Sequence, residues 1–402
     1  MADIKLKVPN LRFKGFTDYW EQRKLGDFGS VAMNKRIFKK QTTEVGDVPF
    51  YKIGTFGKKP DAYISNELFE EYKSKYPYPK EGDLLISASG SIGRIVEYKG
   101  QKAYYQDSNI VWLKHNDQLN NLFLKAFYQI VKWDGTEGST IKRLYNKNIL
   151  RTRIFLPTTL EQEKVGNIIE CIERLLTLQQ RKLELLKQLK KGFLQKMFAE
   201  KNNKQPVLRF KGFHDDWEQR KLGEIVEWSK GSGLSKDALN IQGIGVPVIH
   251  YADLYKFNSV QKEVIHWTMN DIGTKIPENN LLFPMSDVTP DGLARTSTVL
   301  QSNVKAGGDV LIAKLNKDIL STFMSYQINR NKNQILPLVT GTTVRHINSK
   351  SLSTLKVTVP GKNEQKYVGS ILMRFDSLIA LHQRKQNHLK LLKKSLLPQM
   401  FM

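Results

Sequence analysis

The sequence has very little cysteine, no long apolar run and few acidic residues relative to its basic ones. Its one cysteine, Cys171, excludes an intrachain disulfide framework and is typical of a reducing compartment, so we expect a cytoplasmic protein. No apolar run approaches the roughly 18 residues of a membrane-spanning helix, so we expect no membrane partner. Asp and Glu number 39 against 63 Lys and Arg, for a formal net charge of +24. This excess favours a polyanionic partner, and nucleic acid is the first candidate.

Motifs of common active sites are also missing. The chain has no phosphate-binding GxxxxGKS/T loop, no HExxH or paired-cysteine metal motif, no dinucleotide-binding GxGxxG and no Asn-Pro-Pro-aromatic methylation motif. One loose nuclease-like spacing is present, in which Pro60 and Asp61 precede Glu71 and Lys73. We predict a helix or turn around Glu71, whereas nucleases of this type normally place these ligands of Mg²⁺ on a strand. A stand-alone sequence-specific endonuclease that acts through Asp61, Glu71 and Lys73 is the first alternative function.

The chain does contain an internal repeat. The segments 11–26 and 208–223 are identical except at two positions, where the first segment has Thr17 and Tyr19 and the second has His214 and Asp216. Three pairs of segments align, namely 11–26 with 208–223, 138–170 with 341–373, and 189–198 with 392–401. Each repeat of roughly 200 residues therefore has shared ends around a middle that differs.

The last part of each repeat is predicted to be a long helix. Pro157 and Pro360 stop the preceding strand-like stretches, and apolar residues then recur with a seven-residue period, so two such helices should pair. The predicted contact stripe comprises Ile168, Ile172, Leu175, Leu186, Leu189 and Phe193, widened by Ile169, Leu176 and Leu183, and in the second copy Val368, Ile371, Phe375, Leu378, Leu389, Leu392 and Leu396. Its predicted polar positions are Gln179, Lys182, His382 and Lys385.

The middle of each repeat is predicted to be a mixed α/β domain. Short strand-like runs precede one segment with helical spacing, and their order is comparable in the two repeats. The strand-like runs are 48–56, 82–88, 94–98 and 108–114 in the first repeat and 246–254, 279–285, 296–300 and 309–315 in the second; the helical segments are 119–131 and 318–328.

Basic and glycine-containing loops in these middles are candidate DNA contacts. The glycines of loop 87–94 let backbone N–H groups approach an anion, and Arg94 can fork onto a phosphate or a guanine. Its counterpart, 284–295, is longer but again ends in arginine. The segments 139–143 and 342–346 match in position and differ in hydrogen-bonding groups, as two different base sequences would require. The alternatives are a glycine-rich turn and a solvated charged face.

The predicted DNA-binding residues combine these loops with nearby cations. In the first repeat they are Lys35, Arg36, Lys39, Lys40, Lys58, Ser87, Ser89, Ser91, Arg94, Lys142 and Arg143. In the second repeat they are Lys230, His250, Ser286, Asp287, Arg295, Arg345 and His346. We predict that the lysines meet phosphates and that the loops approach base edges.

In combination these features resemble the specificity subunit of a type I restriction-modification system. The resemblance rests on WEQRKLG opening each half, on the glycine loop after GDLLIS, and on helices that begin LPTTLEQEKV or VPGKNEQKYV. It implies two α/β target recognition domains separated by two long antiparallel coiled-coil helices. The implied bounds are 1–157 for the first domain, 158–200 for the central helix, 201–360 for the second domain and 361–402 for the C-terminal helix.

The resemblance also implies a non-catalytic chain whose two domains each read one half of a bipartite sequence in double-stranded DNA. Two methyltransferase subunits that use S-adenosylmethionine would dock on it, and restriction or motor subunits that use ATP and Mg would join, while this chain itself would bind no cofactor and no metal. A DNA-binding protein without enzyme partners is the second alternative.

The near-identical ends of the repeats suit two copies of one partner, which need two equivalent surfaces. The predicted partner-binding residues are Phe13, Phe16, Trp20, Phe210, Phe213 and Trp217. In the alternative interpretation, these side chains pack each domain against its own helix.

Overall fold

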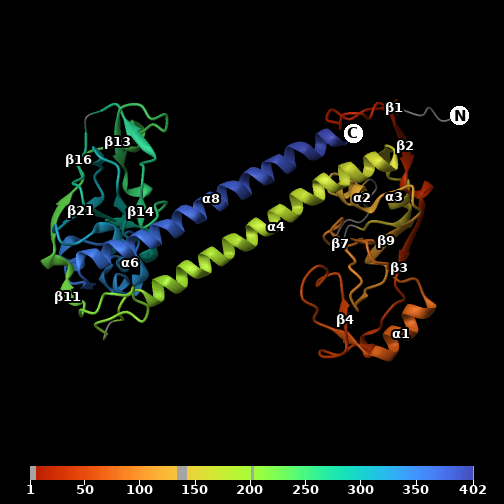
Figure 1. The fold of residues 1–402 in the computed structure, drawn as a ribbon, viewed down its shortest axis with the longest axis horizontal. Coiled ribbons are helices and arrows are strands. Elements are labelled where there is room, and N and C mark those ends of the chain that lie inside the picture. The colour runs from red at the N-terminus through yellow and green to blue at the C-terminus, as the bar shows by residue number, and fades with distance from the viewer. Residues whose placement is uncertain (1–5, 134–142, 201–202, 271, 402) are drawn as a thin grey trace. The chain divides into compact units, whose positions relative to one another are not determined.

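The structure, a computed structural model, describes residues 6–133, 143–200, 203–270 and 272–401. The chain divides into two compact units, one of Met1–Gln180 with Lys385–Met402 and the other of Arg181–Arg384. Each unit joins a mixed α/β domain to a part of both long helices, α4 (Thr159–Lys196) and α8 (Lys362–Met400), which are the yellow-green and blue helices of Figure 1. The predicted mixed α/β class is confirmed.

The first unit is built around the antiparallel sheet β3-β9-β6-β7. Its central strand begins with the run Ile-Val-Trp-Leu, which is buried as expected for a strand covered on both faces. A second sheet, β5-β4-β8, pairs β4 and β8 in parallel, and a third, β1-β2-β10, joins the start of the repeat to the strand before α4. The strands are β1 Leu6–Lys7, β2 Trp20–Lys24, β3 Gly29–Met33, β4 Val48–Tyr51, β5 Tyr63–Ile64, β6 Leu84–Ser87, β7 Ile95–Glu97, β8 Tyr104–Tyr105, β9 Ile110–His115 and β10 Arg153–Leu156, and the shorter helices are α1 Asn66–Lys75, α2 Asn121–Tyr128 and α3 Asn146–Arg151.

The second unit repeats this plan. The sheet β12-β21-β17 corresponds to β3-β9-β6, β15-β13-β20-β16 contains the counterpart of β5-β4-β8, and β11-β23 corresponds to β2-β10. The strands are β11 Glu218–Lys221, β12 Val226–Lys230, β13 Val246–Ile249, β14 Val260–Gln261, β15 His266–Thr268, β16 Thr274–Lys275, β17 Asn280–Pro284, β18 Ser286–Asp287, β19 Thr298–Val299, β20 Lys305–Ala306, β21 Val310–Leu315, β22 Arg345–His346 and β23 Lys356–Val359, and the shorter helices are α5 Pro290–Leu293, α6 Ser321–Arg330 and α7 Ser349–Leu352.

Within each unit the two long helices pair in an antiparallel manner. In the first unit Lys393 of α8 donates to Glu173 of α4 at 2.6 Å, and Gln386 bonds Gln180. In the second unit Lys190 of α4 pairs with Asp376 of α8, and the rings of Phe193 and Phe375 lie 5.1 Å apart. In both units the C-terminal part of one long helix therefore packs against the N-terminal part of the other.

The buried stripe of these helices differs in part from the predicted one. Several predicted positions are exposed, and in each case the next residue along the helix is the more buried one. The pairs are Ile168 and Ile169, Leu175 and Leu176, Leu189 and Lys190, Leu378 and Ile379, and Leu392 and Lys393. Of the predicted polar positions, Lys182 and Lys385 are exposed, whereas His382 is buried together with Gln386. Ile169 and Leu176, which were predicted to widen the stripe, are thus more buried than the residues before them. Where apolar residues are adjacent, two neighbouring stripes have the same period and only one of them is covered. Lys190 and Lys393 are partly buried instead through ion pairs with Asp376 and Glu173.

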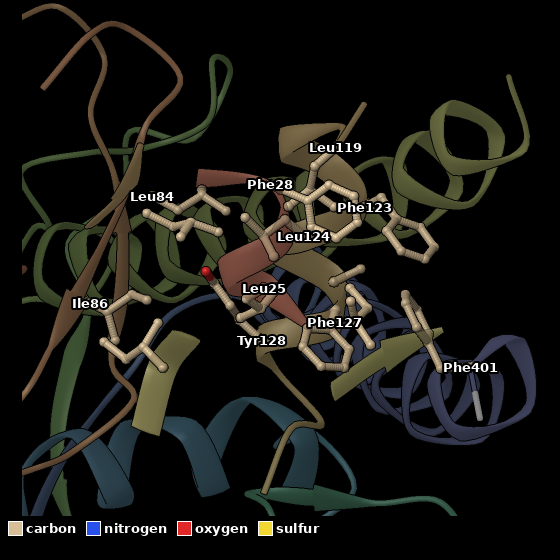
Figure 2. Close-up of a cluster of buried hydrophobic side chains, with 14 of the residues drawn as sticks. Leu25, Phe28, Leu84, Ile86, Leu119, Phe123, Leu124, Phe127, Tyr128 and Phe401 are labelled. Carbon is tan, nitrogen blue, oxygen red and sulfur yellow. The ribbon is translucent and has the colours of Figure 1, made fainter. Parts of the chain in front are cut away.

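The end of each repeat packs against an α/β domain. In the first unit Phe401 lies 4.9 Å from Phe123 and 6.3 Å from Trp20, between ring centroids, and Figure 2 shows it beside Phe123 and Phe127 in the main core. In the second unit Phe198 makes the corresponding contacts, at 5.2 Å from Phe323 and 6.4 Å from Trp217. The similar segments 189–198 and 392–401 therefore make the same contact, once in each unit.

Candidate nucleic-acid interface

A buried carboxylate fixes the opening segment of each repeat. Glu161, 1% exposed, accepts hydrogen bonds from Arg12 at 2.6 and 2.8 Å and from the Trp20 indole N–H at 3.2 Å. A buried carboxylate needs such a charged and hydrogen-bonded partner. The second unit repeats the arrangement with Glu364, Arg209 and Trp217, at 2.7, 2.8 and 3.1 Å.

The glutamine that follows each of these glutamates joins the first turn of its long helix to the residues just before an earlier helix, α2 in the first unit and α6 in the second. Gln162 accepts from the backbone N–H of Asn120 at 2.9 Å and donates to the carbonyls of Gln118 and Pro157, both at 3.0 Å. Gln365 makes the same three kinds of bond in the second unit, to Leu320, Asp318 and Pro360. The near-identical ends of the repeats thus make near-identical internal contacts, as the packing interpretation predicts. In the sequence these two Glu-Gln pairs lie within the helix beginnings LPTTLEQEKV and VPGKNEQKYV, which do not indicate these contacts.

The predicted partner-binding residues divide into buried and accessible ones. Trp20 and Trp217 are 0% and 3% exposed, which leaves almost no side-chain surface for a partner. The four phenylalanines are partly exposed, and Phe16, Phe210 and Phe213 lie beside the first turns of the long helices. Lys164 lies 5.1 Å from the ring centre of Phe16, and Tyr367, at the equivalent helix position, lies 5.5 Å from Phe210 and 5.8 Å from Phe213.

Two of the predicted DNA-binding loops come together in the first unit. Ser89 of the glycine loop forms an antiparallel bridge with Arg143, which lies far from it in the sequence. The Ser89 hydroxyl donates to the side-chain oxygen of Asn109 at 2.8 Å, and Arg143 Nη2 donates to the Ser108 hydroxyl at 2.7 Å. The result is a polar surface at the end of β6 and the start of β9.

The corresponding loops also meet in the second unit. Strand β18 pairs with β22, so that Ser286 faces His346 and Asp287 faces Arg345. The Ser286 hydroxyl lies 3.0 Å from His346 Nδ1, and the Tyr255 hydroxyl donates to the Ser286 carbonyl at 2.5 Å. The buried Nε of Arg345 has no hydrogen-bond partner among the described residues.

The arginines that end the two loops have positioning roles. Arg94 donates to the Phe56 carbonyl at 2.9 Å, and Arg295 donates to the Tyr255 carbonyl at 2.5 Å and to the Phe257 carbonyl at 3.5 Å. Burial lowers the pKa of Arg295. Although the two loops differ in length, both arginines use their guanidinium groups to hold a neighbouring loop, which reduces their availability to DNA.

Three further candidates are engaged with the protein backbone. The buried Ser87 hydroxyl accepts from the Arg94 N–H at 2.8 Å and donates to the Ser91 carbonyl, which closes the glycine loop. Asp287 accepts from the N–H groups of the two following residues, at 2.6 and 3.3 Å. His250 Nδ1 accepts from the Ala252 N–H at 3.3 Å, and burial lowers the pKa of His250. These contacts shape the loops rather than present free polar groups.

The remaining described candidates lie on the surface. Ser91 is exposed, and the others are exposed cations that need no backbone movement to meet phosphate, namely Lys35, Arg36, Lys39, Lys40, Lys58 and Lys230. Arg36 is paired with Asp107 at 3.6 Å and Lys230 with Asp309 at 3.9 Å. Lys142 lies outside the described residues.

The sequence interpretation missed one exposed aromatic residue beside the first of these surfaces. Tyr145, 42% exposed, has Arg143 and Lys147 over its ring at 6.0 and 5.7 Å. The basic residues around it in the sequence were a signal of this cluster. Aromatic rings between cations are typical of surfaces that contact nucleic acid.

The nuclease-like spacing does not form a cluster of ligands. Asp61 is paired with Lys52 at 2.9 Å, whereas Glu71 is paired with Lys75 at 2.9 Å on the exposed helix α1. Lys73 lies 5.4 Å from the ring centres of Phe69 and Tyr78. Within the described residues no group of three or more His, Cys, Asp or Glu side chains could hold a metal ion. The described helices also include none that is long and apolar enough to span a bilayer.

The fold and these surfaces define a protein with two similar α/β units that carry different polar groups at equivalent places. Residues 17–188 and 214–391 match the type I restriction modification DNA specificity domain. These two matches cover most of the chain, which therefore belongs to the family of DNA specificity subunits of type I restriction-modification systems. The recognition made from the sequence is confirmed.

Individual relatives agree with this assignment. Over 152 residues the chain is 58% identical to a Haemophilus influenzae protein assigned as a type I restriction enzyme specificity subunit, an alignment that spans 38% of this chain and 40% of that relative. The type I restriction enzyme MjaVIII specificity subunit of Methanocaldococcus jannaschii is 22% identical over 399 residues, which span 86% of this chain and 90% of that one. The crystal structure of the S subunit of a type I system from M. genitalium shares the fold, with a TM-score of 0.65 at 14% identity over 98% of this chain and 99% of that one.

Proposed function

We propose that each unit reads one half of a bipartite sequence in double-stranded DNA. The observation that carries this proposal is the pair of equivalent surfaces with different polar groups, Ser89 with Arg143 in one unit and Ser286 with His346 in the other. Equivalent backbones place both surfaces at the same part of each domain, and different side chains suit different base edges. Surrounding cations such as Lys39, which is exposed, would hold the phosphates.

Two methyltransferase subunits are the proposed direct partners. The partly exposed aromatic surfaces around Phe16 and around Tyr367 recur once in each unit, so they suit two copies of one subunit. Aromatic side chains of this kind are enriched at protein interfaces. We propose that restriction or motor subunits join the same complex in the cytoplasm.

The chemistry is proposed to lie on those partners. Methylation would use S-adenosylmethionine bound by the methyltransferase subunits, and restriction would use ATP and Mg bound by the motor subunits, while this chain acts as a non-catalytic specificity subunit. The separate ion pairs of Asp61 and Glu71 support this assignment over a stand-alone endonuclease.

Reconstitution tests the proposal. The purified chain, mixed with the methyltransferase subunit encoded in the same genome, should methylate plasmid DNA at one bipartite sequence when S-adenosylmethionine is added. Neither protein alone should do so. Cutting of plasmid by the chain alone with Mg²⁺, abolished by Asp61→Ala, would instead establish the endonuclease function. Specific DNA binding without any association with a methyltransferase subunit would favour the second alternative.

Binding of the assembled complex to DNA is expected to be strongly salt-dependent. If about six cations reach phosphate, the affinity should fall by about 10³-fold between 50 and 200 mM salt. Replacing both Lys39 and Lys40 by glutamine should reduce the slope of log K against log salt by about two without changing the preferred sequence. Lys75→Gln is the matched control, because Lys75 already pairs with Glu71. A slope unchanged by the double substitution would remove these lysines from the interface.

A further inference from the structure

Arg143 and His346 occupy equivalent backbone positions. Each lies in an antiparallel bridge opposite a serine, Ser89 in the first unit and Ser286 in the second. The next residue anchors this bridge in both units, since the Leu144 N–H donates to the Ala88 carbonyl at 2.8 Å and the Ile347 N–H donates to the Met285 carbonyl at 3.0 Å. Both anchoring residues are buried, at 2% exposure. The equivalence therefore comes from the same main-chain bonds in two loops of different length.

The segment that carries the serine in each bridge is also bonded to the central sheet of its domain. The Ala88 N–H donates to the Asn109 carbonyl at 2.8 Å, and the Met285 N–H donates to the Asp309 carbonyl at 3.0 Å. Each bridge is thus attached to the central sheet of its domain through the residues just before β9 and β21. A side chain presented from such a bridge keeps its direction, as a group that reads a base must.

The two side chains are oriented by a serine hydroxyl. Arg143 Nη2 donates to Ser108 Oγ at 2.7 Å and to the Ser108 carbonyl at 3.4 Å. His346, an exposed residue, has its Nδ1 3.0 Å from Ser286 Oγ, while the Ser286 carbonyl accepts from the Tyr255 hydroxyl at 2.5 Å. In both units the serine contact involves one nitrogen, and the side chain has further nitrogens that can bond a ligand.

The other arginines of these loops are less suited to distinguish the two halves of the target, because Arg94 and Arg295 are the same residue at the end of both loops. Arg94 and Arg295 donate to backbone carbonyls, and Arg345 Nη1 donates to the Gly341 carbonyl at 3.2 Å. The exposed lysines are flexible and carry one compact charge, which suits phosphate better than a base edge. Within each bridge the position of Arg143 or His346 is therefore the one whose chemistry differs most between the units.

We infer that the position shared by Arg143 and His346 specifies a base in each half of the target, and that Arg143 reads a guanine. The inference rests on the proposed function and adds a base and a residue to it. Two guanidinium donors match the O6 and N7 acceptors of guanine, which is the commonest specific pairing of arginine with a base. An imidazole offers one outward nitrogen and cannot make that two-point contact. The two halves of the target should therefore differ at this base.

The test exchanges the two residues. The full chain with its methyltransferase subunits selects duplexes from a randomised pool, and the bound sequences are read for the natural chain, for Arg143→His and for His346→Arg. Arg143→His should lower the preference for one guanine in one half of the target by about 5- to 150-fold. His346→Arg should create a guanine preference at one position of the other half.

Controls separate base reading from general effects. Arg36→His makes the same chemical change at an exposed cation and should weaken binding without altering the selected sequence. Arg143→Gln and His346→Gln form a second pair that also loses or changes the base contact, and thermal unfolding identifies any variant that does not fold. Each histidine or arginine introduced is already accommodated at the equivalent place in the other unit.

The outcomes distinguish the inference from the function on which it rests. A natural chain that selects no two-part sequence overturns both. A natural chain that selects one, with the folded Arg143 and His346 variants selecting the same bases at reduced affinity, overturns the inference alone and makes both residues phosphate contacts. A change in both halves from either single substitution also overturns it.

Discussion

Replacing Glu161 by alanine is expected to lower the free energy of unfolding of the first unit by about 3–5 kcal/mol, because the change leaves a largely enclosed guanidinium without its counter-charge. Glu161 is 1% exposed and the Arg12 side chain 14% exposed, so water replaces the lost partner poorly. The Trp20 N–H, bonded to Glu161 at 3.2 Å, would lose its acceptor as well. The carboxylate also raises the pKa of Arg12, which therefore stays charged.

The matched variant in the second unit makes this prediction specific. Glu364→Ala removes the same contacts from Arg209 and Trp217 and should destabilise only the second unit. Hydrogen exchange followed through each unit can measure the two effects separately, and Glu161→Gln should lose less stability than Glu161→Ala because it keeps an acceptor. Equal loss of protection in both units from Glu161→Ala would show that the network does not act locally.

The hydrogen bonds of Glu161 and Glu364 show which features of the repeat the sequence could predict and which it could not. Near-identical opening segments and similar helix starts predicted a common structure, and the structure supplies the reason, since each opening segment is bonded to the start of the long helix in its own unit. The sequence could not indicate that Trp20 and Trp217 would be buried, because an aromatic residue in a basic segment suits a partner surface equally well. The bond from the indole to Glu161 and the packing of Phe401 against Trp20 decide between these roles.

The paired helices show a different limit. Heptad spacing correctly predicted two long helices, but neighbouring residues such as Ile168 and Ile169 allow two stripes with the same period. Which stripe is buried depends on the partner helix, where His382 and Gln386 occupy buried positions that hydrophobicity alone does not predict. The register is thus set by contacts such as that of Glu173 with Lys393, between segments far apart in the chain.

The sequence predicted the candidate interface as separate loops. In the structure these loops pair with each other and form one surface in each unit. Glycine content and basic residues identified loop 87–94 and Arg143, but the bridge between Ser89 and Arg143 joins segments that lie far apart in the sequence. Arg94 was the most conspicuous candidate because it ends the loop, and its bond to the Phe56 carbonyl gives it a supporting role. Local sequence identifies polar groups, whereas tertiary contacts decide which of them remain available.

Exchanging one reading surface for the other is expected to rewrite one half of the target. Because the strand pairs align Met33 with Val111 and Lys230 with Leu311, residues 32–143 correspond to residues 229–346. Replacing the first segment by the second gives a chain that carries the reading surface of the second repeat in both units. The segment must extend to position 143, since Ser89 and Arg143 form one bridge and a shorter exchange would combine halves of two surfaces.

The chimera should lose methylation at the original site and methylate a sequence in which the first half is replaced by the bases of the second half. Methylome sequencing of cells that carry the chimera with the methyltransferase subunit measures this directly, and the reverse exchange, of 229–346 by 32–143, should duplicate the other half. Trp20, Glu161 and Phe401 lie outside the exchanged segment, and Phe323, which would replace Phe123 as their neighbour, makes the same ring contacts in its own unit. A folded chimera that still methylates the original sequence, or that changes both halves, would show that the bases are read outside residues 32–143 and 229–346.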